Sequence, residues 1–288
     1  MNNYHIYEEV GRGKYSVVYK GRKKKTIEYV AVKSVERSRK KKLMDEVAIF
    51  QTIENDHIQM KQGPSAMPGT TWHPNILKFH NWYETRNHFW IILEYCSGSD
   101  LYAIIEQDKK LSEQSIKKLA YELLEGLSYL HSLGIIFGDL KPSNVLINEY
   151  CHLKLCDFSL AKKVTDLADH AFINSAEERT SSHANASSKN KAGTPFYMAP
   201  ELFQKRSYDS GVDIFAFGTL LWEILTREVP YDGLDAADIR DKAERGDVLR
   251  LPYGTDQRLQ NLINQCRSVS APQRPTFEQV VATLAQFC

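Results

Sequence analysis

The sequence predicts an α+β protein in which a small β-rich N-terminal region precedes a larger, mainly helical C-terminal region. Residues 4–35 alternate in character and are rich in β-branched and aromatic residues, and short turns divide them into three runs. This pattern is typical of an antiparallel meander. From residue 200 onward helical patterns dominate. The strand-like signal ends near residues 94–98, which is where the two regions are expected to join.

One helix and two further strands are expected between the meander and the join. Apolar residues recur at helical spacing within residues 38–53, so this segment is expected to form the main helix of the N-terminal region. Strand-like runs return at residues 75–84 and 88–96.

The C-terminal region is expected to begin with a long helix over residues 112–134. Ser112 is a residue type that caps helices, and Gly134 suits the turn that follows one. Residues 145–159 are expected to form two short strands joined by a turn. Residues 212–226 are nearly all apolar but carry two acids and are too short to cross a bilayer, so they predict a buried helix and no membrane insertion.

Two segments differ in composition from the rest. Residues 54–72 are rich in Gly, Pro and polar residues, and residues 163–192 contain a low-complexity polar run. Both are expected to be long mobile loops.

Composition limits the possible partners. The 288 residues suit one large domain or two closely packed lobes, and the net charge of +1 gives no overall attraction to nucleic acid, so none is expected as a partner. The basic runs at residues 20–25 and 37–42 are interpreted as solvated surface. Five scattered cysteines without a CxxC pair, and an N-terminus without a signal-peptide core, favour a reducing compartment and hence the cytoplasm.

Phosphate chemistry is first indicated by residues 11–18, GRGKYSVV. Gly11 and Gly13 allow the backbone to approach a ligand closely, and N–H groups of such a turn can cover phosphates. Ser16 stands where a third glycine is often found. By itself this stretch is weak evidence, because most such matches are plain hairpin turns.

A lysine on a strand and a glutamate on the helix that follows it strengthen the indication. Lys33 ends the run VAVK, in which Ala31 and Lys33 share one face of the strand. Glu46 lies on the apolar-facing part of the expected helix over residues 38–53. An ion pair between Lys33 and Glu46 would aim the ammonium at phosphate oxygens.

Two polar turns complete the set. In the turn DLKPSN, Asp139 can accept the proton of an incoming hydroxyl, Lys141 can neutralise the phosphoryl group, and Asn144 can bind Mg²⁺. Asp157 in CDF supplies a carboxylate for Mg²⁺. Each residue alone suits a turn, but coincidence does not explain their combined order along the chain.

The whole set resembles the catalytic domain of eukaryotic protein kinases of the serine/threonine type, over residues 4–288. The segments AGTPFYMAPE and QRPTF extend the resemblance, and within them Glu201 and Arg274 are expected to pair. The N-terminal part is similar to the unc-51-like/Fused branch, whereas the C-lobe has some tyrosine-kinase-like features. The resemblance implies a bilobal fold, with an N-lobe over about residues 4–95 and a C-lobe over about 96–288.

The resemblance also implies roles for individual residues. Protein substrates and Mg-ATP are the implied partners, Asp139, Lys141, Lys33 and Glu46 the catalytic residues, and Asn144 and Asp157 the metal ligands. Leu93 would precede the hinge that binds adenine. The expected ATP-binding residues are Val10, Gly11, Gly13, Ser16, Val18, Ala31, Lys33, Leu93, Glu94, Cys96, Asp100 and Leu146.

Three positions depart from the family pattern. Phe137 and Gly138 stand where kinases usually carry His-Arg, and Ser159 replaces a glycine. Phe137 is expected to join an edge-to-face stack of aromatic rings between the lobes, formed with Phe50, Phe79 and Phe158. Gly138 cannot receive a phosphate, so the usual phosphate-operated switch is expected to be missing.

Three functions remain open from the sequence. The favoured one is an active Mg-ATP-dependent serine/threonine kinase, because all the charged residues are present. The departures leave room for a nucleotide-binding pseudokinase that acts as a scaffold for partners still unknown. A nucleotide-independent interaction module is disfavoured by the Lys33–Glu46 pair, because a buried charge without a function is costly.

Overall fold

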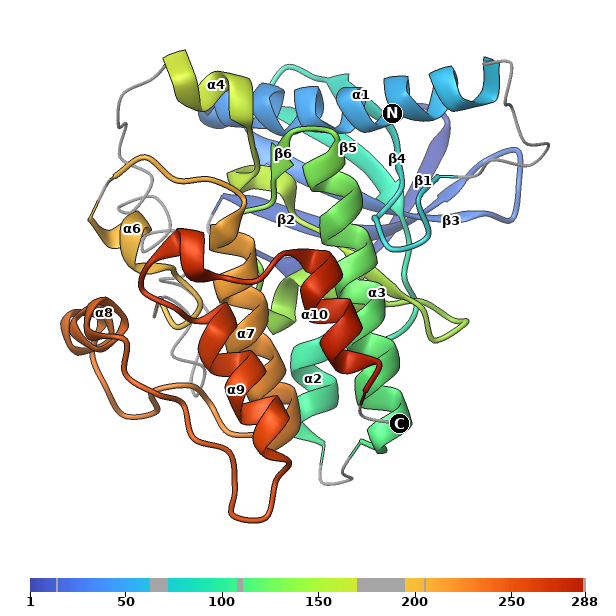
Figure 1. Cartoon of the computed structure of the whole chain (residues 1–288). Coiled ribbons are helices and arrows are strands. Elements are labelled where there is room, and N and C mark those ends of the chain that lie inside the picture. Colours follow the sequence, from blue (N-terminus) through green and yellow to red (C-terminus); the bar gives the residue numbers. More distant parts are fainter. Residues whose placement is uncertain (14, 63–71, 108–110, 170–194, 205, 287–288) are drawn as a thin grey trace.

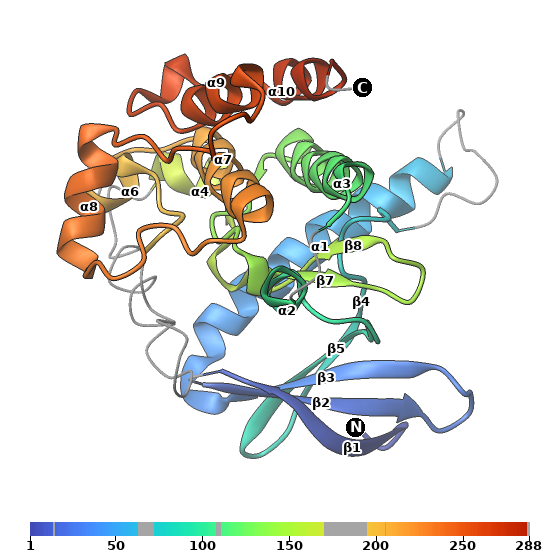
Figure 2. The same cartoon turned by 90° about the horizontal axis from the view of Figure 1, so that it is seen from below.

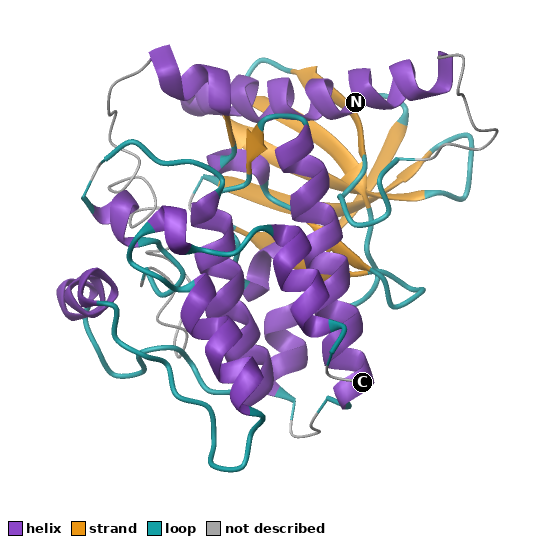
Figure 3. Ribbon diagram, in the orientation of Figure 1, coloured by secondary structure: helices purple, strands orange, loops and turns teal. Residues whose placement is uncertain are grey.

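The computed structural model describes residues 1–13, 15–62, 72–107, 111–169, 195–204 and 206–286, and it has two lobes (Figure 1). A β-sheet with one long helix forms the N-lobe, and the C-lobe is mainly helical, as colouring by secondary structure shows (Figure 3). The predicted α+β bilobal fold is therefore confirmed. Within the described residues, every helix is too short or too polar to cross a lipid bilayer.

The N-lobe sheet has five antiparallel strands in the order β1-β2-β3-β5-β4, seen along one edge of the molecule in Figure 2. Val30 and Val32 are fully buried on one face of β3, whereas Ala31 and Lys33 lie on the other face, as the alternation predicts. The strands are β1 (Tyr4–Arg12), β2 (Ser16–Lys23), β3 (Tyr29–Glu36), β4 (Phe79–Glu84) and β5 (His88–Glu94).

The N-lobe helix is longer than the sequence predicts. A short 3-10 helix, η1 (Arg37–Arg39), leads into α1 (Lys40–Gln62), so residues 54–62 are helical and the expected loop over 54–72 is wrong for this part. The reason is local, because the glycines and prolines of that segment begin only at residue 63. Residues 63–71 lie outside the described residues, and Trp72 is already buried.

The C-lobe follows β5 and is built around two long helices. Helix α3 begins at Ser112, whose side chain accepts a hydrogen bond from the Ser115 N–H, and Gly134 after its end has φ of 67°. The helices are α2 (Leu101–Glu106), α3 (Glu113–Ser132), α4 (Val164–Asp169), α6 (Pro200–Phe203), α7 (Gly211–Thr226), α8 (Ala236–Arg245), α9 (Gln257–Cys266) and α10 (Phe277–Leu284). The 3-10 helices are η2 (Pro142–Asn144), η3 (Phe158–Leu160) and η4 (Ala271–Gln273).

Two pairs of short strands flank the turns that contain Asp139 and Asp157. The strands β7 (Val145–Ile147) and β8 (Leu153–Leu155) form the hairpin that the sequence predicts. The pair β6 (Ile135–Ile136) and β9 (Lys162–Lys163) is antiparallel as well. Because β9 and α4 occupy residues 162–169, the expected loop over 163–192 is wrong at its start, and residues 170–194 lie outside the described residues.

Helix α7 is the buried axis of the C-lobe, as predicted for the apolar run over residues 212–226. Every residue from Val212 to Ile224 is buried, which is typical of a helix that is apolar all round. Helices α3 and α9 pack against it, and α10 packs against both of these helices (Figures 1 and 2). Arg274 binds Glu201 through two hydrogen bonds of 2.6 and 2.8 Å, which confirms the predicted pair.

The aromatic rings expected between the lobes are in contact. Phe137 packs edge-on against Phe158 at 5.3 Å between ring centroids, and Phe158 packs edge-on against Phe50 at 5.0 Å. Phe50 and Phe79 are stacked with an interplanar angle of only 12°, so the expectation of edge-to-face contacts throughout is wrong for this pair. Each such contact contributes about 0.5–1.5 kcal/mol beyond area burial.

Candidate active site

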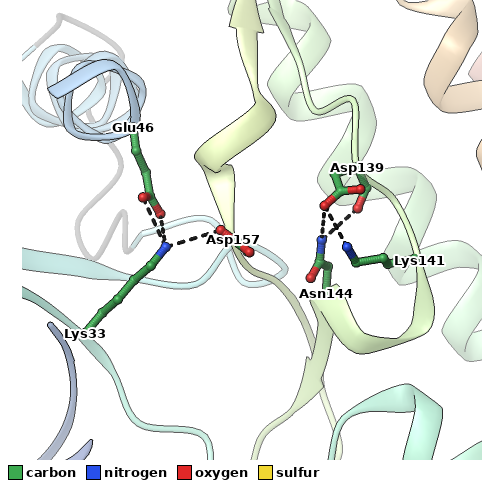
Figure 4. A network of polar contacts seen from close by, with 6 residues as sticks. All are labelled: Lys33, Glu46, Asp139, Lys141, Asn144 and Asp157. Atoms are coloured by element: carbon green, nitrogen blue, oxygen red, sulfur yellow. Dashed lines mark hydrogen bonds and ion pairs between the residues drawn. The ribbon is translucent and has the colours of Figure 1, made fainter. Parts of the chain in front are cut away.

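An ion-pair network joins strand β3, helix α1 and the turn after β8. The ammonium of Lys33 lies 2.8 and 3.0 Å from the two carboxylate oxygens of Glu46 and 3.2 Å from Oδ1 of Asp157 (Figure 4). The side chains of Lys33 and Glu46 are only 12% and 4% exposed. The predicted Lys33–Glu46 pair is therefore present, and it reaches the predicted metal ligand Asp157.

Burial and charge act against each other in this network. Burial alone would raise the pKa of Asp157, but the neighbouring ammonium of Lys33 outweighs it and the pKa is lowered. For Lys33 burial would lower the pKa, but the carboxylates of Asp157 and Glu46 raise it. Asp157 and Lys33 are both held in their charged forms, which is the state that binding phosphates and a cation requires.

A second network lies in the turn between β6 and β7. The ammonium of Lys141 donates to Oδ2 of Asp139 at 2.9 Å. The amide nitrogen of Asn144 donates to the same carboxylate oxygen at 2.9 Å and to the Asp139 carbonyl at 2.8 Å. Asp139, Lys141 and Asn144 therefore form one hydrogen-bonded group (Figure 4). The charges of Asp139 and Lys141 also act on the pKa of Asp157, so the two networks share one site.

Asp213 at the start of α7 holds the turn in place. Its buried carboxylate accepts hydrogen bonds from the Phe137 N–H at 2.8 Å and the Gly138 N–H at 2.7 Å. Its Oδ2 also lies 2.7 Å from Nε2 of His131 on α3. Sequence reasoning noted two acids in the apolar run over residues 212–226 but missed this support and missed His131. A carboxylate inside an apolar helix is the signal that could have suggested it.

Two departures from the family pattern have a local structural explanation. Gly138 has φ of 72°, in the left-handed region, which costs about 1–2 kcal/mol for other residues and nothing for glycine. In the turn after β8 the left-handed residue is Asp157, with φ of 61°, whereas Ser159 lies in η3. A serine at 159 therefore meets no demand for positive φ.

Strand pairing brings the predicted ATP-binding residues of the N-lobe together. Gly11 pairs with Val18, Val18 with Lys33, and Ala31 with Leu93. Val10, Gly13 and Ser16 belong to β1, the turn and β2. Their role in ATP binding stays a prediction.

The remaining predicted ATP-binding residues lie where the lobes join. Leu146 on β7 bridges to Asp100, whose carboxylate caps α2 by accepting from the Ala103 N–H at 2.8 Å. Cys96 lies just after β5, and burial raises the pKa of its thiol to about 12, so it stays protonated.

The hinge contains an ion pair that sequence reasoning missed. Glu94 ends β5, and its carboxylate lies 3.1 Å from the ammonium of Lys154 on β8 and accepts a hydrogen bond from the Lys78 N–H at 3.0 Å. Lys154 is 8% exposed. A lysine between two leucines in a short buried strand was the available signal, and the structure shows that it ties the C-lobe to the hinge.

The residues predicted to bind a metal fit Mg²⁺. The amide nitrogen of Asn144 faces Asp139, so its oxygen is turned away from that carboxylate (Figure 4). Asp157 adds a second oxygen donor with a lowered pKa. Mg²⁺ favours such hard oxygen ligands and keeps several waters, so one or two protein side chains suffice. The described residues contain no cluster of three or more His, Cys, Asp or Glu side chains that could hold a metal ion.

Comparison with known proteins finds the same family along most of the chain. The model of the protein kinase domain matches residues 4–284. Serine/threonine-protein kinase RUNKEL from Arabidopsis thaliana is 43% identical over 264 residues, which are 91% of this chain and 17% of that protein. Serine/threonine-protein kinase ULK4 from Mus musculus is 32% identical over 248 residues, 84% of this chain and 18% of that protein.

A third relative, serine/threonine-protein kinase 36 from Mus musculus, is 32% identical over 231 residues, 80% of this chain and 15% of that protein. The chain thus spans less than a fifth of the length of these relatives. The similarity to ULK4 agrees with the expected unc-51-like branch. With a family model that covers nearly the whole chain, the chain belongs to the protein kinase family.

Proposed function

We propose that this domain transfers the γ-phosphate of Mg-ATP to serine or threonine hydroxyls of protein substrates. The observation that supports the proposal most is the joint assembly of two networks, Lys33–Glu46–Asp157 and Asp139–Lys141–Asn144, on one site. Phosphoryl transfer requires charge and position more than covalent chemistry. Both requirements are met by side chains that are held by hydrogen bonds before any substrate arrives.

Each residue has a definite task in this proposal. Lys33, oriented by Glu46, binds phosphate oxygens, and Asp139 accepts the proton of the incoming hydroxyl. Lys141, which already touches Asp139, balances the charge that develops on the transferred group. Asn144 and Asp157 hold Mg²⁺, which screens the negative charge of the phosphates when it is bound.

The finer features of the proposal rest on the sequence. The turn residues KPSN and Thr194 before Pro195 favour serine or threonine as acceptor, and the relatives above carry serine/threonine-protein kinase in their names. A cytoplasmic location is proposed because the thiols of Cys96, Cys151, Cys156 and Cys266 are unpaired.

The test is phosphate transfer from radiolabelled ATP to a generic basic protein, with Mg²⁺ or with EDTA. We expect Mg²⁺-dependent label on serine or threonine, and none with the Lys33→Met variant. Lys117→Met is the matched control, because Lys117 lies on the C-lobe helix α3, where it pairs with Glu113. It should keep full activity.

A thermal-shift measurement separates the proposal from the pseudokinase alternative. Saturating ATP with Mg²⁺ should raise the melting temperature, because a ligand that binds only the folded state stabilises it. Stabilisation by ATP without any transfer would indicate a pseudokinase. A chain that shows neither would have to be an interaction module.

A further inference from the structure

The basic run over residues 37–42 makes contacts inside the molecule that the catalytic residues do not explain. Arg37 pairs with Glu84 at 3.1 Å and donates to the Arg86 carbonyl at 2.9 Å. Lys40 lies 5.7 Å from the ring centroid of Phe89. Arg39, between them, turns to the glycine-rich turn between β1 and β2. The run, interpreted as solvated surface from sequence, therefore anchors the start of α1 to its surroundings.

The contact of Arg39 is a stack on Tyr15. The guanidinium carbon lies 3.5 Å from the centroid of the tyrosine ring, which is van der Waals contact and well within the distance for a cation–π interaction. The guanidinium is planar and always charged, so it stacks on an aromatic ring better than an ammonium does. Both side chains are half-buried.

The backbone of the turn presents Tyr15 to Arg39. The Gly13 N–H donates to the Ser16 carbonyl at 2.8 Å and closes the turn. The Glu36 N–H at the end of β3 donates to the Tyr15 carbonyl at 3.3 Å, which holds the turn against the start of η1. The ring of Tyr15 therefore meets the residue that precedes α1.

Arg39 is rigidly connected to the ion pair of the site. It ends η1, and α1 begins at the next residue, so Glu46 follows on the same helix after about 9 Å of helical rise. Glu46 binds Lys33. A displacement of α1 that breaks the Lys33–Glu46 pair would therefore also pull Arg39 away from Tyr15.

We propose that Tyr15 and Arg39 form a latch that couples the glycine-rich turn to helix α1, and that both are positioning residues for the phosphates of ATP. The proposal rests on the proposed function, because it assumes that the turn covers phosphates. The latch stabilises the turn in the arrangement in which Lys33 and Glu46 are paired. Bound ATP then favours the position of α1 in which Lys33 and Glu46 are paired. That position raises the affinity for ATP by the same free energy, as linkage requires.

The test is the affinity for Mg-ATP and for adenosine, measured by titration calorimetry. Arg39→Gln and Tyr15→Leu should each weaken Mg-ATP binding about two- to fivefold, as expected for a cation–π contact that keeps partial access to solvent. Tyr15→Phe keeps the ring and should bind as the unchanged protein does. Adenosine has no phosphates, so its affinity should stay the same in all variants.

Two controls make the test specific. Arg37→Gln removes the same charge from the same 3-10 helix without touching the turn, and it should not weaken Mg-ATP binding. The double variant of Tyr15→Leu with Arg39→Gln should bind no more weakly than either single variant, because both changes break one contact. These residues lie near the surface, and unfolding curves verify that every variant is folded.

The outcomes distinguish the latch from the function on which it rests. Three results would each contradict the latch. The first is a loss of Mg-ATP affinity in the double variant that equals the sum of the two single losses. The others are a loss of Mg-ATP affinity in Arg37→Gln as large as in Arg39→Gln, and a loss of adenosine affinity as large as that of Mg-ATP affinity. If the unchanged protein binds no ATP, the proposed function and the latch both fall. If the unchanged protein and all variants bind ATP with the same affinity, only the latch is contradicted.

Discussion

Replacing Asp213 by asparagine is expected to weaken the fold and the catalytic turn together. The fully buried carboxylate receives three contacts, from the N–H groups of Phe137 and Gly138 and from the ring of His131. Two of them use Oδ2 and the third, from Gly138, uses Oδ1. An asparagine that keeps its oxygen at the Oδ2 position turns its NH₂ group toward the Gly138 N–H, so at least this hydrogen bond is lost.

The size of the effect follows from these contacts. A hydrogen bond to a charged group contributes about 1.5–3 kcal/mol, and a buried donor left without an acceptor costs about 1–3 kcal/mol. We expect the free energy of unfolding to fall by about 2–4 kcal/mol, out of a total of about 5–15 kcal/mol for a typical domain. Asp139 follows Gly138 directly, and a shift of about 1 Å at a catalytic group lowers turnover about 100-fold.

Urea denaturation and single-turnover phosphate transfer measure the two effects on the same protein. Asp235→Asn is the matched control: Asp235 caps α8 by accepting from the Ala237 and Asp238 N–H groups, and asparagine caps a helix equally well. This control should stay within about 0.5 kcal/mol of the unchanged protein, as surface changes usually do. If Asp213→Asn unfolds at the same urea concentration and turns over at the same rate as the unchanged protein, the structural argument is wrong.

Three further predictions concern catalysis, pH and phosphorylation. Asp139→Asn should abolish transfer but leave ATP affinity unchanged, because the carboxylate acts on the hydroxyl; wild-type turnover would contradict this. Burial raises the pKa of Glu223 from 4.5 to about 7, so its neutral form stabilises the fold at low pH and that stabilisation is lost as pH rises through about 7. Glu223→Gln should therefore gain up to about 3 kcal/mol relative to the unchanged protein between pH 5 and pH 8, measured by urea denaturation; an equal difference at both pH values would refute it. Phosphatase treatment should leave the initial rate unchanged, because Gly138 offers no receiver for a phosphate in the segment over residues 163–192; a large fall, restored by a phosphomimetic, would disprove this.

Local sequence patterns predicted several elements of the fold correctly. Alternation along β3 correctly separated Val30 and Val32 from Ala31 and Lys33, because side chains of a strand point to opposite faces. Ser112 and Gly134 correctly bounded α3, because capping depends on the residues at the helix ends. The end of α1 was missed because the average composition of residues 54–72 concealed a helical stretch before the first glycine.

The candidate site was predictable wherever its residues lie close together in sequence. Asp139, Lys141 and Asn144 share one turn, so their spacing alone indicated a common task, and the structure brings them into hydrogen-bond contact. Lys33 lies on a strand and Glu46 on the helix that follows it, and the sequence pattern predicted both elements. Their pairing could therefore be expected before the structure was known.

By itself the sequence determined the two-lobed fold, many of its elements and the chemical identity of the candidate catalytic groups. Only the tertiary structure decided that Asp213 supports the catalytic turn, that Lys154 binds Glu94 at the hinge, and that Arg39 stacks on Tyr15. The physical reason is the distance along the chain between the residues that interact. Periodicity and capping act over a few residues along the chain, whereas a buried carboxylate or a stacked guanidinium finds its partner only when packing brings distant segments together.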